Sequence, residues 1–138
     1  MKLKALLLSL LSVVGLARAA EPTDFNRLVD AIATVENTPG RGKHGERSPW
    51  QITHAVWTSY SSLPFSYADV DSITARAEQR GVAMQHARYI ASIINNPTPY
   101  RIALAWNAGI GAVLHNTFSD ASVSYAKRVR NVYEEAGK

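Results

Sequence analysis

An apolar helical stripe that ends on a carboxylate is the feature that most constrains this chain. Apolar residues recur at the spacing of one helix face, at Phe25, Leu28, Val29 and Ile32. Glu36 follows Ile32 by four residues and Val29 by seven, so it continues the same face. The pattern predicts a helix over residues 24–36 whose last side chain lies against apolar surface.

A carboxyl group in that position has the properties of a general acid. Apolar surroundings disfavour its charged form and raise its pKa. A carboxylic acid that stays protonated near neutral pH is able to donate a proton in catalysis. Glu36 is therefore the first candidate for a catalytic residue. The alternative is structural: Glu36 ends the helix and its side chain extends into water.

The first 20 residues have the pattern of a secretory signal peptide. Two lysines precede an apolar run over residues 5–16, and Ala17 and Ala19 occupy the small-residue positions of a cleavage site. The run is too short to span a bilayer. We therefore expect an exported protein, periplasmic or secreted, and an uncleaved membrane anchor is the alternative.

Removal of this segment leaves residues 21–138, enough for one compact domain with its own core. The segment carries three of the 15 Lys and Arg residues and none of the 11 Asp and Glu residues, so the net charge falls from +4 to +1. That balance, without a long basic run, argues against nucleic acid as a partner. The chain has no Cys, which excludes disulfides, a thiol nucleophile and a Cys-ligated metal.

Helical signals recur along the rest of the chain, and alternating strand patterns are scarce, so the sequence predicts a predominantly α fold. Further helices are expected at about residues 52–57, 71–94, 99–107 and 122–135. Thr23 is the expected cap of the first helix, and Gly81 is expected to interrupt the long one. Breaker residues predict a loop over 37–49, a polar connection over 59–66 and a helix stop at 95–97.

Three blocks of sequence resemble the lytic transglycosylases of the lysozyme superfamily. Residues 45–52, Gly-Glu-Arg-Ser-Pro-Trp-Gln-Ile, are similar to a segment that reads roughly G-A-x-G-L-M-Q-I in that family. Residues 106–113, Trp-Asn-Ala-Gly-Ile-Gly-Ala-Val, resemble its Y-N-A-G-x-G-A-V block. Residues 125–129, Tyr-Ala-Lys-Arg-Val, resemble its Y-V-x-x-V segment. Together with a Glu that ends the first helix, these blocks occur in the family's order and are spread over nearly all of residues 24–133.

The resemblance implies a lysozyme-like single domain with a cleft between helices that binds peptidoglycan glycan strands, and it makes Glu36 the catalytic acid. The residues it implies for substrate binding are Ser48, Trp50, Gln51, Ile52, Trp106, Asn107, Ala108, Gly109 and Tyr125. From residue type alone, Trp50 and Trp106 are either core aromatics or sugar platforms. Gln51 is either a ligand or a loop-capping amide, and residues 107–109 either approach the cleft closely or end a helix.

The resemblance further implies no cofactor, no metal and a monomer. It leaves open whether the protein serves wall turnover, a secretion or conjugation apparatus, or a phage. Four departures from the family pattern indicate a divergent form. Asn37 stands where Ser usually follows the catalytic Glu, and the loop after it is about three residues shorter. Residues 48–50, Ser-Pro-Trp, replace Gly-Leu-Met, and Trp106 replaces a Tyr, which removes a hydroxyl but keeps a stacking face and one N–H donor.

The carboxylates near Glu36 decide between two reactions. A glycoside hydrolase needs a second carboxylate, and Glu46, Asp69 and Asp71 are the candidates. Glu46 stands where the family carries a small apolar residue, so we interpret it as a solvated loop charge. The sequence therefore favours a lytic transglycosylase that cleaves the bond between N-acetylmuramic acid and N-acetylglucosamine, with Glu36 first as acid and then as base. The alternatives are a muramidase and a non-catalytic wall-binding subunit of an envelope-spanning assembly.

Other motif-like features do not support a different class. Residues 40–43, Gly-Arg-Gly-Lys, lack the first glycine and the Ser or Thr of a phosphate-binding loop. Gly109 and Gly111 lack the third glycine of a dinucleotide fingerprint. The four histidines show no metal-ligand spacing.

Overall fold

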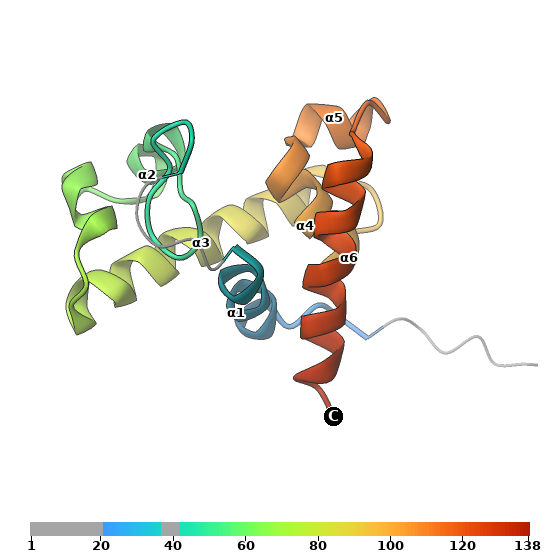
Figure 1. Cartoon of the computed structure of the whole chain (residues 1–138), viewed down its shortest axis with the longest axis horizontal. Helices are drawn as coiled ribbons and strands as arrows, with labels where there is room; N and C mark the ends of the chain where they lie inside the picture. Colours follow the sequence, from blue (N-terminus) through green and yellow to red (C-terminus); the bar gives the residue numbers. More distant parts are fainter. Residues whose placement is uncertain (1–20, 37–41) are drawn as a thin grey trace, which may run out of the picture.

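The computed structural model in Figure 1 describes residues 21–36 and 42–138. The predicted signal peptide and the loop residues 37–41 lie outside the described residues. The described part of the chain is mainly helical and contains no strand, which confirms the predicted α class. Its elements are α1 (Phe25–Glu36), α2 (His54–Tyr60), the 3-10 helix η1 (Phe65–Asp69), α3 (Ile73–Ile93), α4 (Pro99–Ala108), α5 (Ile110–Leu114) and α6 (Asp120–Glu135).

The first helix begins at a carboxylate cap. Asp24 Oδ1 accepts the backbone N–H groups of Asn26 at 3.0 Å and Arg27 at 3.2 Å. The expectation that Thr23 caps this helix is wrong, because the Thr23 hydroxyl donates to the Pro97 carbonyl at 3.2 Å instead. A carboxylate is favoured at this position, because its negative charge also complements the positive end of the helix dipole.

Hydroxyl caps start four further helices, α2, α3, α4 and α6. In each, the side chain accepts the backbone N–H three residues later, and the caps are Thr53, Ser72, Thr98 and Ser119. Pro99 occupies the start of α4, where its fixed φ and missing N–H cause no loss. Local capping chemistry therefore accounts for where these helices begin.

The long helix α3 continues through Gly81 without the expected break. A glycine inside a helix costs about 1 kcal/mol relative to alanine. Its neighbours Val82 and Ala83 are fully buried, and burial of side chains of this kind offsets a cost of that size. The helix ends at Ile93, just before the predicted stop at 95–97.

Figure 1 shows α3 running across the middle of the molecule. At one end of α3, α2 and η1 pack against it, and α4 contacts it toward the other end. Helix α6 packs on both α4 and α1, and α1 also packs on α3. The carboxyl end of α1 therefore lies beside α6, and Glu46 of the following loop is close enough to act on Glu36. No helix in the described ranges is long and apolar enough to cross a membrane.

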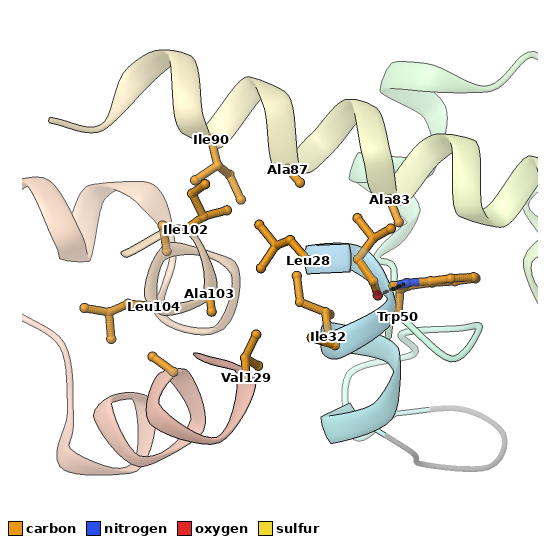
Figure 2. Packing of buried hydrophobic residues seen from close by; sticks show 14 of the residues in the cluster. Leu28, Ile32, Trp50, Ala83, Ala87, Ile90, Ile102, Ala103, Leu104 and Val129 are labelled. Atoms are coloured by element: carbon orange, nitrogen blue, oxygen red, sulfur yellow. Dashed lines mark hydrogen bonds between the residues drawn. The ribbon is translucent and has the colours of Figure 1, made fainter. Parts of the chain in front are cut away.

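The core lies where α1, α3, α4 and α6 meet, and Figure 2 shows its central side chains. Leu28 and Ile32 of α1 are fully buried, as the apolar stripe predicts. They pack in a cluster whose other labelled members are Trp50, Ala83, Ala87, Ile90, Ile102, Ala103, Leu104 and Val129. Each fully buried Leu or Ile contributes about 1.5–3 kcal/mol. This packing holds α1 and positions its last residue, Glu36.

Candidate active site

Glu36 is the last residue of α1, and its side chain is half-buried. Burial raises the pKa of its carboxyl group above the ordinary value, and the negative charge of Glu46 raises it further. Tyr125 and the positive charge of Arg128 act in the opposite direction without cancelling the rise. The carboxyl end of a helix is also its negative end, which disfavours a second negative charge there. These surroundings stabilise the protonated form of Glu36, as a general acid requires.

Tyr125 of α6 lies beside this carboxyl group and is only 4% exposed. Its buried hydroxyl interacts with the Glu36 carboxyl group. Burial, and then the charge of Glu36, raise the pKa of the Tyr125 hydroxyl. Tyr125 therefore stays protonated and is able to donate to the Glu36 carboxylate once that group has lost its proton.

The loop after residue 42 presents Gln51 through a tight, strained turn. Arg47 and Ile52 pair through two backbone hydrogen bonds, from Arg47 N to Ile52 O at 2.9 Å and from Ile52 N to Arg47 O at 2.7 Å. Between them, Ser48 (φ 69°) and Gln51 (φ 51°) adopt left-handed backbone conformations, which are uncommon for residues other than glycine. Strain of this kind persists only where the surrounding structure enforces it, and it clusters at functional sites.

Gln51 uses its amide nitrogen to hold the turn, since Nε2 donates to the Ser48 carbonyl at 3.0 Å. Its carbonyl oxygen lies over Gly42 together with the Glu46 carboxylate, and a Cβ at residue 42 would collide with both. A larger residue at position 42 would therefore displace the ends of these two side chains. The loop-capping interpretation of Gln51 is correct for its amide nitrogen.

Glu46 is held in place by its own loop. Its Oε2 accepts the backbone N–H of His44 at 2.8 Å. Burial pushes the pKa of Glu46 upward, but the backbone N–H groups of Glu46 and His44 outweigh it and lower the pKa below the ordinary value. Glu46 is therefore ionised, is turned toward Gln51, and acts electrostatically on Glu36. Glu46 is therefore a solvated carboxylate whose orientation is set by its own loop.

Three residues of the same block are buried in the protein. Trp50 is 6% exposed, and its indole N–H donates to the Val29 carbonyl of α1 at 2.7 Å. Ile52 is 1% exposed. Ser48 is also buried, and its hydroxyl oxygen accepts the Trp50 backbone N–H at 3.2 Å. The Trp50 indole attaches the loop to α1, whereas the resemblance had implied that all three residues bind substrate.

The Trp-Asn-Ala-Gly block ends α4 and turns the chain into α5. Gly109 has φ 93°, a left-handed value that favours glycine, and its N–H donates to the Ala105 carbonyl at 2.9 Å. This is a helix C-cap, one of the two roles considered for the block. Trp106 is half-buried, Asn107 is exposed and Ala108 is half-buried.

The structure brings Glu36, Tyr125, Arg128 and Glu46 together, with Gln51 beside Glu46. The other two candidate carboxylates are engaged elsewhere: Asp69 pairs with Arg47 at 3.1 Å, and Asp71 pairs with Arg76 at 3.1 Å. The sequence-based selection did not include Arg128. Its position three residues after Tyr125 on one helix places both on the same face, and that spacing was the available signal.

The ligand requirements of a metal are not met in the part of the chain that the structure describes, where no group of three His, Cys, Asp or Glu side chains converges. The site therefore offers acid–base and hydrogen-bonding groups. Comparison of the sequence with known protein-family models, with curated proteins and with solved structures finds no match.

Proposed function

We propose that this protein is a lysozyme-like enzyme that cleaves the β-1,4 bond between N-acetylmuramic acid and N-acetylglucosamine in peptidoglycan. The observation that carries the proposal is the setting of Glu36, a helix-end carboxyl group whose pKa is raised by burial beside a protonated tyrosine. Glycoside cleavage needs such an acid, because the leaving oxygen must be protonated as positive charge develops on the sugar. The three sequence blocks that resemble lytic transglycosylases support the same reaction class.

The favoured route is a lytic transglycosylase reaction with one acid–base residue. Glu36 donates its proton to the glycosidic oxygen while the bond to the muramic acid C1 breaks. The Glu36 carboxylate then takes the proton of the C6 hydroxyl, whose oxygen bonds to C1 and closes a 1,6-anhydro ring. The proton returns to Glu36 and no water is consumed. Tyr125 and Arg128 stabilise the transient carboxylate, because each favours its charged form.

Hydrolysis by the same acid is the second candidate, and Glu46 is the observation that favours it. An ionised carboxylate that acts on Glu36 has the properties of the second group of a hydrolase. In that route Glu46 would activate a water molecule, and the product would carry a reducing end. In the transglycosylase route Glu46 keeps Glu36 protonated, and the Gln51 carbonyl oxygen accepts from the acetamido group of the substrate.

We further propose that the protein acts outside the cytoplasm, on glycan strands, as a monomer. The apolar segment that follows two lysines at the start of the chain supports export. A wall-binding subunit without activity is the remaining alternative. It is disfavoured because it would gain nothing from a half-buried carboxyl group of raised pKa, which destabilises a fold near neutral pH.

Digestion of purified sacculi, followed by mass spectrometry of the soluble fragments, tests both the class and the route. We expect fragments with anhydro ends, which are lighter by one water than reducing ends. We also expect no fragments from Glu36→Gln, whose amide has no proton to donate. Reducing ends throughout would support the hydrolase. Equal release by the wild type and Glu36→Gln would contradict the assignment of the acid.

A further inference from the structure

Four aromatic side chains from three helices meet on α3, outside the groups around Glu36. His86 of α3 lies between Tyr60 of α2 and Trp106 of α4, with ring centroids 6.0 Å and 5.1 Å away. Tyr89, three residues further along α3, stacks beside His86 at 6.5 Å with an interplanar angle of 22°. These four residues form a continuous surface, called here the aromatic strip, which joins α2 to α4 across α3.

The rings of the aromatic strip remain accessible to solvent, in contrast to the other tryptophans. Trp50 and Trp57 are buried, and each donates its indole N–H to a backbone carbonyl at 2.7 Å. Trp106 is only half-buried, as are Tyr60 and His86, and Tyr89 is 49% exposed. The four rings therefore contact one another and keep part of their surface accessible to solvent.

No guanidinium covers the aromatic strip within the described residues, although arginines cover rings elsewhere. The covered rings are Phe25 under Arg88, Phe65 under Arg47, Tyr100 under Arg130 and Tyr133 under Arg27, with distances to the ring centroid of 4.0–5.9 Å. Burial lowers the pKa of His86, so its imidazole is neutral at neutral pH and the strip carries no charge there. Within the described residues, its buried Nδ1 has no hydrogen-bond partner.

We propose that the aromatic strip of Tyr60, His86, Tyr89 and Trp106 is a sugar-binding platform for an N-acetylhexosamine chain, separate from the residues that act on the scissile bond. This inference rests on the proposed action on glycan. A pyranose ring has an apolar C–H face and hydroxyl groups at its edge. Tyrosine and tryptophan match both, because each combines a large apolar face with a polar group at its rim. The strip carries no positive charge that would attract an anionic ligand, and its uncovered faces suit the apolar C–H face of a sugar ring.

The platform is tested by binding, so that the result does not depend on turnover. Glu36→Gln is titrated with a soluble hexamer of N-acetylglucosamine, and Trp fluorescence together with calorimetry reports the dissociation constant. Tyr89→Ala is then added to this background. Because Tyr89 is half exposed, its removal leaves the core intact. We expect binding to weaken about fivefold to tenfold, the size of one lost aromatic contact. Tyr67→Ala on η1 is the matched control, since Tyr67 is 41% exposed and lies outside the strip.

Equal affinity of the Tyr89→Ala and Tyr67→Ala proteins would overturn the platform, and so would a hexamer that does not bind. A change in sedimentation with Tyr89→Ala, without a change in sugar affinity, would assign the strip to protein contacts and overturn the proposal as well. These outcomes are distinguishable from failure of the proposed function. That failure appears as wall cleavage that survives Glu36→Gln, whatever the strip binds.

Discussion

Replacement of Trp50 by Phe is expected to weaken the attachment to α1 of the loop that contains Gln51 and Glu46. The Trp50 indole donates to Val29 O at 2.7 Å and is 6% exposed, so both its hydrogen bond and its packing contribute to the fold. Val29 lies inside α1, and its carbonyl keeps the helical bond after the substitution. The lost bond is therefore at the lower end of the usual range, about 0.5–1 kcal/mol.

The smaller phenyl ring adds a packing loss of about 1–2 kcal/mol, because part of the indole volume stays empty. The total for Trp50→Phe is about 1.5–3 kcal/mol, which urea unfolding followed by circular dichroism would register as a midpoint lower by about 1 M. Activity on cell walls, measured by turbidity well below the midpoint, should fall by about tenfold or more. A loop displaced by about 1 Å costs that much when it positions reacting groups.

Trp57→Phe is the matched control. Trp57 is fully buried, and its indole N–H also donates at 2.7 Å, but its acceptor is the Leu63 carbonyl of the connection after α2. We expect a similar loss of stability and little loss of activity in the folded protein. If Trp50→Phe and Trp57→Phe lose the same activity, or if Trp50→Phe unfolds at the wild-type midpoint, the attachment of the loop through Trp50 is refuted.

Three further predictions concern proton transfer. The folded state holds the Glu36 proton more tightly than the unfolded state, so both activity and the free energy of unfolding should fall as pH rises from about 4.3 through the raised pKa. Glu36→Gln should abolish activity and remove this pH dependence of stability. An NMR titration that shows an unshifted or lowered pKa for Glu36 would contradict its burial. Glu46→Gln removes a negative charge that raises the pKa of Glu36, so the alkaline limb of the pH–activity profile should move to lower pH. Activity at the optimum should fall less than about tenfold. A loss as large as that of Glu36→Gln would favour the two-carboxylate hydrolase. Tyr125→Phe should move the same limb of the profile to higher pH, because the Tyr125 hydroxyl lowers the pKa of Glu36. The free energy of unfolding in urea should fall by less than about 1 kcal/mol. An unchanged pH–activity profile would show that the hydroxyl does not act on Glu36.

Much of the helical architecture was predictable from the sequence, because the signals are local. The stripe over residues 24–36 predicted α1 and the burial of Leu28 and Ile32, and both predictions are confirmed. The boundaries of α3, α4 and α6 lie within about two residues of those expected. Capping chemistry and apolar periodicity act over three or four residues, so a short stretch of sequence is enough to show them.

The short elements and the unbroken course of α3 were not predictable in this way. Helices η1 and α5 have five residues each, too few to be stable without tertiary contacts. Gly81 is a local signal for a break, but the burial of residues on either side of it outweighs that signal. The weak local preference is overridden wherever packing contributes more than about 1 kcal/mol.

Sequence alone determined that a carboxyl group ends an apolar helix face, where a raised pKa and the role of a general acid are expected. Only the tertiary structure decided which groups act on Glu36, because Tyr125, Arg128 and Glu46 reach it from a distant helix and a separate loop. It also decided that Trp50 attaches that loop to α1 whereas Trp106 remains accessible. Periodicity records which face of a helix is apolar, but the neighbours of that face depend on how the helices cross, and crossing is a property of the whole packed chain.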